Sequence, residues 1–339
     1  FKILKRIMNE IEIKHQPLIS VVIPVYNAEK FIDVTLDSLF IQSFNLFEVL
    51  LVNDGSTDNS VNRIKQIIKG DPRFKIINQK NSGPGVARNH GVSLAEAEYI
   101  SFLDSDDYFD PNFLKKMYYS AVKENADIVV CDFDKVTTQG IKIKEYKHYY
   151  NKSLGNIEAF VDILQSNNLT SLSQNKIFKK TLFAKVAFPT GIIINEDVAT
   201  IYRLVLKANK IVFVNQILFH YVQMPGSSMN GFNMQKLKDR LIVSKMIEKH
   251  LIKENLLPQY KYAYNVYYLL NVILSGSIQV CRYSPDWLKN IKNFLINIDN
   301  EIFVFKYIFL LRKHHKRKML ALIILKTNVI FFKKLTKFI

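Results

Sequence analysis

The chain has 339 residues, 48% of them hydrophobic and 12% aromatic, which is enough for a sizeable core and suggests two domains or one domain with an extension. Its two cysteines, Cys131 and Cys281, lie far apart, which excludes a disulfide scaffold and a cysteine-ligated metal and favours a reducing cytosol. No apolar run approaches the roughly 18–20 residues of a membrane-spanning helix, and residues 1–14 carry too many charges for a secretory signal.

The net charge of +17 is concentrated in the last third of the chain. Residues 1–230 hold 27 Lys and Arg against 24 Asp and Glu, a net charge of +3. Residues 231–339 hold 20 against 6, a net charge of +14. We therefore expect an anionic surface partner to meet the C-terminal third.

The first 130 residues alternate between two kinds of apolar spacing. Apolar runs of strand length occur at 18–26, 47–54, 73–79 and 98–104, and segments with helical spacing occur at 29–42, 60–70 and 85–97. Strands that alternate with helices of about ten residues predict an α/β fold with a doubly wound, mostly parallel sheet that is covered on both faces.

Polar clusters follow these predicted strands. They are Asn27, Asp54, the segment 81–88 and the acids from Asp104 to Asp107. Because ligands of such sheets bind outside the carboxyl ends of the strands, the clusters predict a ligand site at one edge of the sheet.

Beyond residue 110 the pattern continues with a helix and a strand up to residue 136, followed by a polar, irregular stretch up to 175. Residues 176–222 predict a short helix, a loop, a helix that begins near Glu196, and a strand. From 235 onward the spacing is helical, and one helix is expected to have Ser284 as N-cap and Pro285 at its first position.

The segment "DSDD" places carboxylates at the end of a buried strand, where unpaired acids repel one another and lose hydration. Two carboxylates at this spacing can offer oxygen ligands to one hard cation, Mg²⁺ or Mn²⁺, that completes its shell with water and substrate phosphates. The alternative is a solvated turn in which Asp104 or Asp110 caps the next helix. The residues alone leave both interpretations open.

Four segments, one of which contains "DSDD", carry a family resemblance. "VVIPVYN", "LLVNDGSTDNS", "NSGPGVARNHG" and "YISFLDSDDYFDP", in this order, resemble the nucleotide-sugar domain of family 2 inverting glycosyltransferases, which have the GT-A fold. "FPTGIIINEDVATIYRLV" resembles the acceptor half of the capsule, lipopolysaccharide and teichoic-acid transferases of that family. The resemblance implies an N-terminal extension (1–17), a GT-A domain (18–230, divided into 18–130 for the nucleotide-sugar and 131–230 for the acceptor) and a basic helical region (231–339).

This resemblance also implies a reaction. The donor would be a UDP-sugar, the cofactor Mn²⁺ or Mg²⁺, and the acceptor a hydroxyl of a glycan or lipid-linked glycan, with one hexosyl or N-acetylhexosaminyl group moved per encounter. The Q-x-x-R-W signature of processive synthases is absent from the sequence.

Site residues carry over from the same motifs. The nucleobase would lie along Pro24, Val25, Tyr26 and Asn27, and Asp54 would bind the uracil ring. Arg88 would lie near the base and the ribose. Asp104 and Ser105 would belong to the donor-binding turn, where Asp104 contacts the ribose. Asp106 would be a ligand of the metal.

The catalytic base implied by the resemblance is Asp197, with Glu196 beside it; without the resemblance both would be first-turn acids that stabilise a helix dipole. His220 is a candidate second metal ligand or a structural residue. Ser227 or Ser228 is a candidate donor to a phosphate oxygen, and Lys176 either approaches the diphosphate or is solvated.

The basic C-terminal region leaves its partner open. Its end mixes Lys and Arg with large aliphatic residues and Phe at helical spacing, which is typical of helices on an anionic membrane surface. A homo-oligomer surface is the second interpretation, and this apolar content disfavours nucleic acid. We expect a cytoplasmic enzyme that is peripheral at the inner face of the cell membrane; the alternative is a nucleotide-binding or anionic-surface-binding protein without transferase activity.

Overall fold

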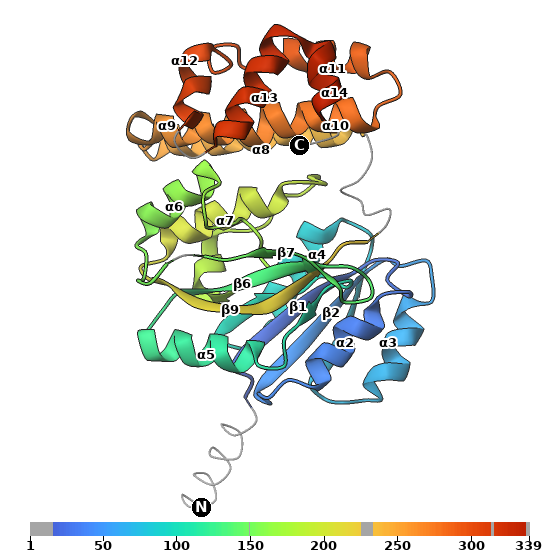
Figure 1. Cartoon of the computed structure of the whole chain (residues 1–339). Helices are drawn as coiled ribbons and strands as arrows, with labels where there is room; N and C mark the ends of the chain where they lie inside the picture. Colours follow the sequence, from blue (N-terminus) through green and yellow to red (C-terminus); the bar gives the residue numbers. More distant parts are fainter. Residues whose placement is uncertain (1–15, 149, 225–232, 313–314, 337–339) are drawn as a thin grey trace, which may run out of the picture. The chain divides into compact units, whose positions relative to one another are not determined.

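A computed structural model describes residues 16–148, 150–224, 233–312 and 315–336 of the chain (Figure 1). Its described residues form two compact units. One lies within 1–159, 171–191 and 203–224, and the other within 160–170, 192–202 and 225–339. The segment 192–202 therefore groups with the C-terminal helices, and the predicted domain boundary at residue 230 stays a prediction.

The first unit is built on a nine-stranded sheet in the order β3-β2-β1-β4-β8-β6-β9-β5, with β7 paired to β6. The strands are β1 (Ile19–Val25), β2 (Phe47–Asp54), β3 (Phe74–Gln79), β4 (Tyr99–Phe102), β5 (Tyr108–Phe109), β6 (Ile128–Val136), β7 (Lys142–Tyr146), β8 (Lys176–Lys179) and β9 (Ile211–Val222). The first four strands are parallel, and so are β6 and β9. The predicted doubly wound, mostly parallel α/β fold is confirmed.

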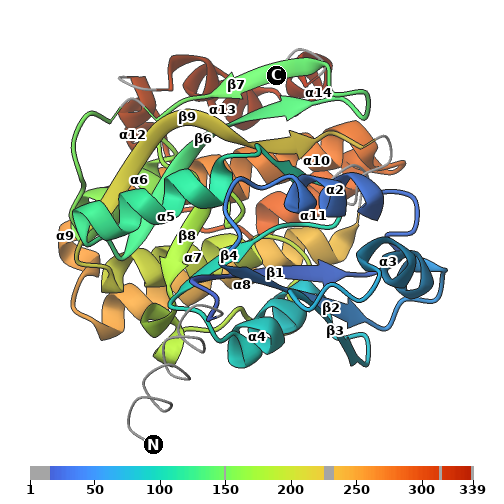
Figure 2. The same ribbon diagram turned by 90° about the horizontal axis from the view of Figure 1, so that it is seen from below.

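Helices cover both faces of this sheet. They are α2 (Ile32–Phe40), α3 (Ser60–Ile68), α4 (Pro84–Leu94) and α5 (Phe113–Glu124). Later in the chain follow the 3₁₀ helix η1 (Lys180–Lys185) of the first unit, and α6 (Asn156–Gln165) and α7 (Glu196–Lys207), whose residues are divided between the two units. Figure 2 shows α2 and α5 on one face and α4 on the opposite face. The three helices expected before residue 100 and the helix expected near Glu196 are thus present.

Helix α4 packs closely on β1 because it has a glycine at the contact. A Cβ atom on Gly91 would lie 2.3 Å from Cγ1 of Val22, which is fully buried in β1. The start of α4 suits its sequence, because Gly83 adopts a φ of +90° that favours glycine and Pro84 occupies the first turn, where no N–H is needed.

Three local predictions are wrong. Residues 176–179 form β8 between β4 and β6, so the short helix begins only afterwards, as η1. The stretch expected to be irregular contains β7 and α6. Helix α11 begins at Trp287 with Asp286 at the N-cap position, two residues later than expected.

The second unit is helical after residue 233. Its helices are α8 (Met234–Lys253), α9 (Leu257–Tyr267), the π-helix η2 (Tyr268–Leu274), α10 (Ser275–Tyr283), α11 (Trp287–Ile296), α12 (Phe305–Ile308), the 3₁₀ helix η3 (Phe309–Arg312), α13 (Lys316–Thr327) and α14 (Val329–Leu335). The predicted helical C-terminal region is confirmed. Within the described ranges, no helix is long and apolar enough to cross a membrane.

The chain order of the strands indicates where a ligand is expected to bind. From the central strand β1 the chain proceeds outward on one side through β2 and β3, and then returns to place β4 on the other side of β1. The order of the strands therefore reverses between β1 and β4. In open α/β sheets a ligand crevice forms outside the carboxyl ends of the strands at such a point.

Candidate active site

The loop after β1 is tied to the turn after β2. Asn27 adopts a left-handed φ of +51°, its side-chain oxygen accepts a hydrogen bond from Thr57 N at 2.8 Å, and its own N–H donates to Ser56 Oγ at 3.1 Å. Within the loop Val25 is buried and Tyr26 is 52% exposed, with Pro24 in β1 before them. An exposed aromatic ring on a fixed loop is suited to stacking against a planar base.

Asp54, the last residue of β2, is buried and anchors the loop that precedes α4. One carboxylate oxygen accepts hydrogen bonds from Gln79 Nε2 and Ser82 N, both at 2.8 Å, and the other accepts from Gly83 N at 2.8 Å. The residue is 3% exposed. These contacts give Asp54 a structural role, and its contact with uracil stays a prediction.

The carboxylates after β4 have three different environments, and Asp104 is the one held by cationic and amide donors. Its Oδ1 accepts a hydrogen bond from Arg88 Nη2 at 2.8 Å, and its Oδ2 accepts one from Gln174 Nε2 at 2.6 Å. Arg88 is buried and lies 5.4 Å from the centre of the Phe188 ring. The positive partner that the sequence demands for this carboxylate is therefore Arg88.

Asp106 pairs with no cation among the described residues. Burial, and then the charge of Asp104, raise the pKa of its carboxyl to about 6. Asp107 N donates to the Asp104 carbonyl at 3.2 Å, which closes the turn around the half-buried Ser105. Asp106 is thus the carboxylate of this turn that has room for a positive ligand.

Asp107 fastens the end of β9. Its Oδ1 accepts a hydrogen bond from Val222 N at 2.8 Å, and its backbone carbonyl accepts one from Thr35 Oγ1. Its Oδ2 is buried without a hydrogen-bond partner among the described residues. Burial, followed by the charges of Asp106 and Asp104, raises the pKa of this carboxyl well above its usual value.

His220 lies on β9, the strand next to β5, which follows this turn. It pairs in register with Tyr108, and the two rings stack with their centres 4.6 Å apart. Its Nδ1 is 2.7 Å from Oδ1 of the buried Asp134. Within the described part of the chain, no group of three or more His, Cys, Asp or Glu is arranged to hold a metal ion by itself.

A cavity of about 320 Å³ adjoins this turn. Asp106 and Tyr108 line it together with Lys30 and Phe31 at the start of α2 and Gly140 in the turn between β6 and β7. The sheet edge therefore offers a hollow next to the open carboxylate.

Comparison with known proteins identifies the family. Residues 20–188 match the model of glycosyl transferase family 2. Over 230 residues the chain is 34% identical to glycosyltransferase GlyG of Streptococcus pneumoniae. This match covers 62% of this chain and 73% of GlyG. The chain belongs to glycosyl transferase family 2.

Two further likenesses extend this result. The glycosyltransferase is 32% identical over 219 residues to a poly(ribitol-phosphate) β-glucosyltransferase of Bacillus spizizenii, covering 62% of this chain but only 33% of that one. The solved structure of S. aureus TarS 1–349 in complex with UDP-GlcNAc matches with a TM-score of 0.62 and 22% identity over 90% of each chain, which shows a shared GT-A fold. The interpretation of the chain as an enzyme is confirmed, in place of a binding protein without transferase activity.

The two acids predicted to act on the acceptor lie in the other compact unit of the glycosyltransferase. Glu196 and Asp197 form the first turn of α7, and Thr200 Oγ1 donates a hydrogen bond to the Glu196 carbonyl. The structure thus unites the residues predicted to bind the donor, but the meeting of Asp197 with that site stays a prediction.

No motif predicted the role of the buried Gln174, and the surroundings of Lys176 were left open between two alternatives. Gln174, which holds Asp104, lies in a polar stretch before β8 that carries no recognisable motif. Lys176 is fully buried, and its Nζ donates to the Leu172 carbonyl and to Asn175 Oδ1, both at 2.7 Å. The solvated alternative for Lys176 is therefore wrong. Ser227 and Ser228 lie outside the described residues.

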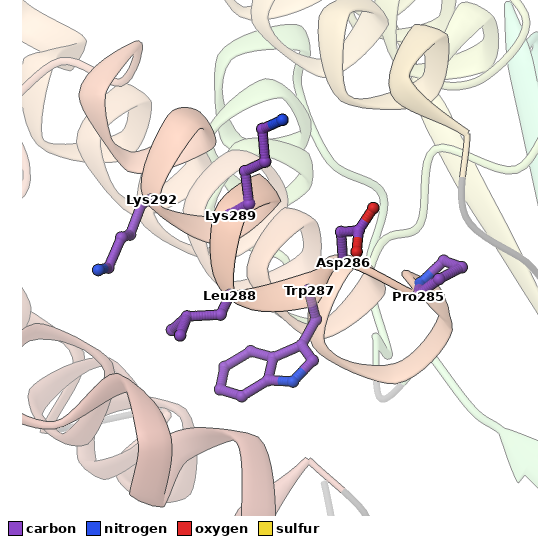
Figure 3. Close-up of a pocket in the computed structure, with 6 residues that line it drawn as sticks. All are labelled: Pro285, Asp286, Trp287, Leu288, Lys289 and Lys292. Carbon is purple, nitrogen blue, oxygen red and sulfur yellow. The ribbon is translucent and has the colours of Figure 1, made fainter.

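A second hollow in the glycosyltransferase, of about 580 Å³, lies at the start of α11 (Figure 3). It is lined by Pro285, Asp286, Trp287, Leu288, Lys289 and Lys292. Figure 3 shows the Trp287 and Leu288 side chains on one side of the helix and Lys289 on another, and Lys333 Nζ lies 5.4 Å from the centre of the Trp287 ring. None of the family motifs contributes to it.

Proposed function

We propose that this glycosyltransferase moves one sugar from a UDP-sugar to a hydroxyl of a bacterial surface glycan, by a metal-dependent single displacement that inverts the anomeric carbon. The observation that carries the proposal is the turn after β4, where Asp104 is held by Arg88 and Gln174 while Asp106 remains open to a cation. The TarS complex with UDP-GlcNAc supports the choice of donor. The poly(ribitol-phosphate) glucosyltransferase supports a surface polymer as acceptor.

The residues at this turn fit a hard divalent cation. Asp106 is a half-buried oxygen ligand whose raised pKa reports a site that disfavours a bare negative charge. Mg²⁺ and Mn²⁺ are commonly held by one or two carboxylates plus substrate phosphates, and Asp106 would supply such a carboxylate. When bound, the ion offsets negative charge on the leaving diphosphate as a Lewis acid.

His220 is proposed as a further ligand of the same ion. Metal-bound histidines usually direct their other ring nitrogen to a carboxylate, which fixes the ring and the tautomer. His220 has this arrangement, because Asp134 engages its Nδ1 and leaves Nε2 for another partner. As a ligand, His220 should contribute to metal binding, so His220→Ala should lower the affinity for Mn²⁺. For a structural histidine the same change should leave that affinity unchanged.

The protein's own part in the proposed chemistry is positioning and proton removal. The loop from Pro24 to Asn27 and Asp54 would hold the uracil, with Arg88 and Asp104 on the ribose. Asp197 would take the proton from the acceptor hydroxyl as its oxygen attacks the anomeric carbon, while the bond from that carbon to the departing UDP breaks on the opposite side. General-base catalysis of this kind contributes about 10²–10⁴-fold.

A panel of UDP-sugars tests the proposal. We expect UDP release from one of UDP-glucose, UDP-galactose, UDP-GlcNAc and UDP-GalNAc in Mn²⁺ or Mg²⁺, with slow transfer to water when no acceptor is present, and none in EDTA. Asp197→Asn is nearly isosteric and removes only basicity, so it should lower turnover by about 10²-fold or more while UDP affinity is kept. Glu196→Gln is the matched control. Turnover that survives Asp197→Asn and is lost in Glu196→Gln would assign the base to Glu196.

The C-terminal region is proposed to bring the enzyme to an anionic membrane surface at the cytoplasmic face. Exposed apolar side chains there include Phe305, Phe309, Leu320, Ile330 and Phe331. The neighbouring Arg312, Lys316 and Arg317 are exposed as well. Apolar side chains that insert beside cationic ones are the composition of an interfacial surface, and a homo-oligomer contact is the outcome that would replace it.

A further inference from the structure

The loop that leads to the candidate base is held by a buried carboxylate on α8. Asp239 is fully buried, and its Oδ2 accepts hydrogen bonds from Ile193 N at 2.7 Å and from Ile194 N at 3.3 Å. Its Oδ1 accepts a hydrogen bond from Gln235 Nε2 at 2.8 Å, one helical turn earlier. Both carboxylate oxygens are therefore used, and two of the three bonds fix the backbone of the loop.

Only two residues separate Ile194, which Asp239 holds, from Asp197, the predicted general base in the first turn of α7. Asn195 follows Ile194 in a left-handed conformation with a φ of +66°, and its carbonyl accepts the hydrogen bond from Ala199 N that opens the helix. Asp197 lies in that first turn. The direction in which α7 starts, and hence the position of the Asp197 carboxylate, depends on how the backbone at 193–195 is held.

Apolar side chains of the loop are buried in the same unit. They are those of Ile192 and Ile194. Arg240, which follows Asp239 on α8, donates from Nη1 to the Asn271 carbonyl at 2.8 Å. Helix α8 therefore holds the loop through Asp239 and is itself bonded to η2 through Arg240.

We propose that Asp239 is a positioning residue for the glycosyl transfer, acting through the backbone of Ile193 and Ile194 on the general base Asp197. This inference rests on the proposed function, in which Asp197 removes the acceptor proton. A base must come within about 2.6–3.2 Å of the proton donor, and a misplacement of about 1 Å costs about 10²-fold in rate. The basic C-terminal region would then take part in catalysis as well as in localisation.

Substitution of Asp239 should separate turnover from donor binding. Asp239→Ala removes both acceptor oxygens and the three hydrogen bonds that they accept. It is expected to lower kcat about 10–100-fold, with the KM for the UDP-sugar that performs best in the panel kept within about twofold. Asp239→Asn keeps an oxygen that can accept hydrogen bonds from the loop amides but loses the charge. Its kcat should therefore lie between those of the wild type and Asp239→Ala. Hydrogen exchange should be faster at 192–198 in Asp239→Ala and unchanged in peptides from α5.

Asp162 on α6 provides a matched control in the same compact unit. It is buried, and its Oδ2 likewise accepts hydrogen bonds from two backbone N–H groups, those of Asn168 and Leu169. Its loop carries no candidate catalytic residue. At equal folded fraction, Asp162→Ala should therefore keep a kcat within about threefold of the wild type.

The inference is overturned if folded Asp239→Ala turns over at the wild-type rate, or if Asp162→Ala lowers kcat equally. Should Asp239→Ala fail to fold, a wild-type kcat in Asp239→Asn with faster exchange at 192–198 would overturn it too. The proposed function has its own test. A wild-type kcat in Asp197→Asn removes the base assignment, whereas a loss in Asp197→Asn alone, without one in Asp239→Ala, removes only the role of Asp239.

Discussion

Asp54 illustrates how one side chain can serve the fold and the site at once. Its two oxygens accept from Gln79, Ser82 and Gly83, so it joins the end of β2 to the entry of α4. The Asp54 carboxylate accepts hydrogen bonds from N–H groups, and the uracil ring carries an N–H group of this kind. Its predicted part in base recognition would add to this structural part.

Asp54→Ala should destabilise the protein, because three donors lose their acceptor and only part of that loss can be met by water. An unsatisfied buried donor costs about 1–3 kcal/mol, so we expect the free energy of unfolding to fall by about 2–4 kcal/mol in a urea titration. The exposed Asp37→Ala is the control and should change it by less than about 0.5 kcal/mol. A stable Asp54→Ala protein would show that the α4 loop does not depend on this residue.

The acids from Asp104 to Asp107 mark the limit of residue-level prediction from the sequence. Their position after a buried strand predicted that they would meet a positive group. It could not predict that Arg88 pairs with Asp104, or that Asp107 faces Val222 N. Both partners depend on the packing of distant segments, and the donor-binding roles of Asp104 and Asp106 remain predictions.

At the scale of elements, α4 and β1 show how a motif glycine sets the distance between a helix and the sheet. Gly91 lies on the buried face of α4 directly against Val22. Any side chain would push the helix outward, and with it Arg88, which is one turn earlier on the same helix. Helix position and the Arg88–Asp104 pair are therefore coupled.

Gly91→Ala should consequently destabilise the protein by about 1–3 kcal/mol, the usual cost of overpacking a core. Gly155→Ala is the control and should be near neutral, because a Cβ atom there meets nothing within 4 Å. Val22→Ala makes room for the new methyl group, so the double variant should lose less stability than the two single changes added together. Strict additivity in thermal or urea unfolding would contradict the proposed contact.

Regular elements with strong apolar periods were predictable, and short or polar ones were not. The continuous apolar runs of β1 and β2 and the helical spacing of α3 predicted those elements within about two residues. Strand β5 has two residues inside the acidic turn, and β7 is mostly exposed, so neither carries a buried apolar pattern. Their formation depends on pairing with β9 and β6.

At the scale of the whole molecule, the excess positive charge and the C-terminal helices coincide, and these helices also have a core of their own. Leu322 and Phe332 are buried, and Lys326 Nζ donates to the Phe303 carbonyl. Removal of the region beyond residue 305 would strip these contacts. Charge substitution on the exposed surface is therefore the cleaner test of membrane attachment.

The triple change of Arg312, Lys316 and Arg317 to Ser should abolish co-sedimentation with phosphatidylserine-containing vesicles at low salt. Each basic residue near such a surface contributes about 1 kcal/mol, so the partition constant should fall about 100-fold while UDP-sugar hydrolysis is unchanged.

Lys65, Lys115 and Lys123 supply the charge-matched control, because all three are exposed on α3 and α5 in the first unit. Their triple change to Ser should leave vesicle binding intact. If the wild-type protein ignores these vesicles, and the C-terminal substitutions instead alter its mass in solution, the surface serves assembly and the membrane proposal fails.

The central claim is that Asp106 engages the donor through a divalent cation, and calorimetry of UDP binding tests it most directly. We expect UDP to bind the wild-type protein in Mn²⁺ at least about tenfold more tightly than in EDTA, and to bind Asp106→Asn weakly under both conditions. Equal affinity of the wild-type protein in Mn²⁺ and in EDTA, or metal-dependent binding that persists in Asp106→Asn, would contradict it.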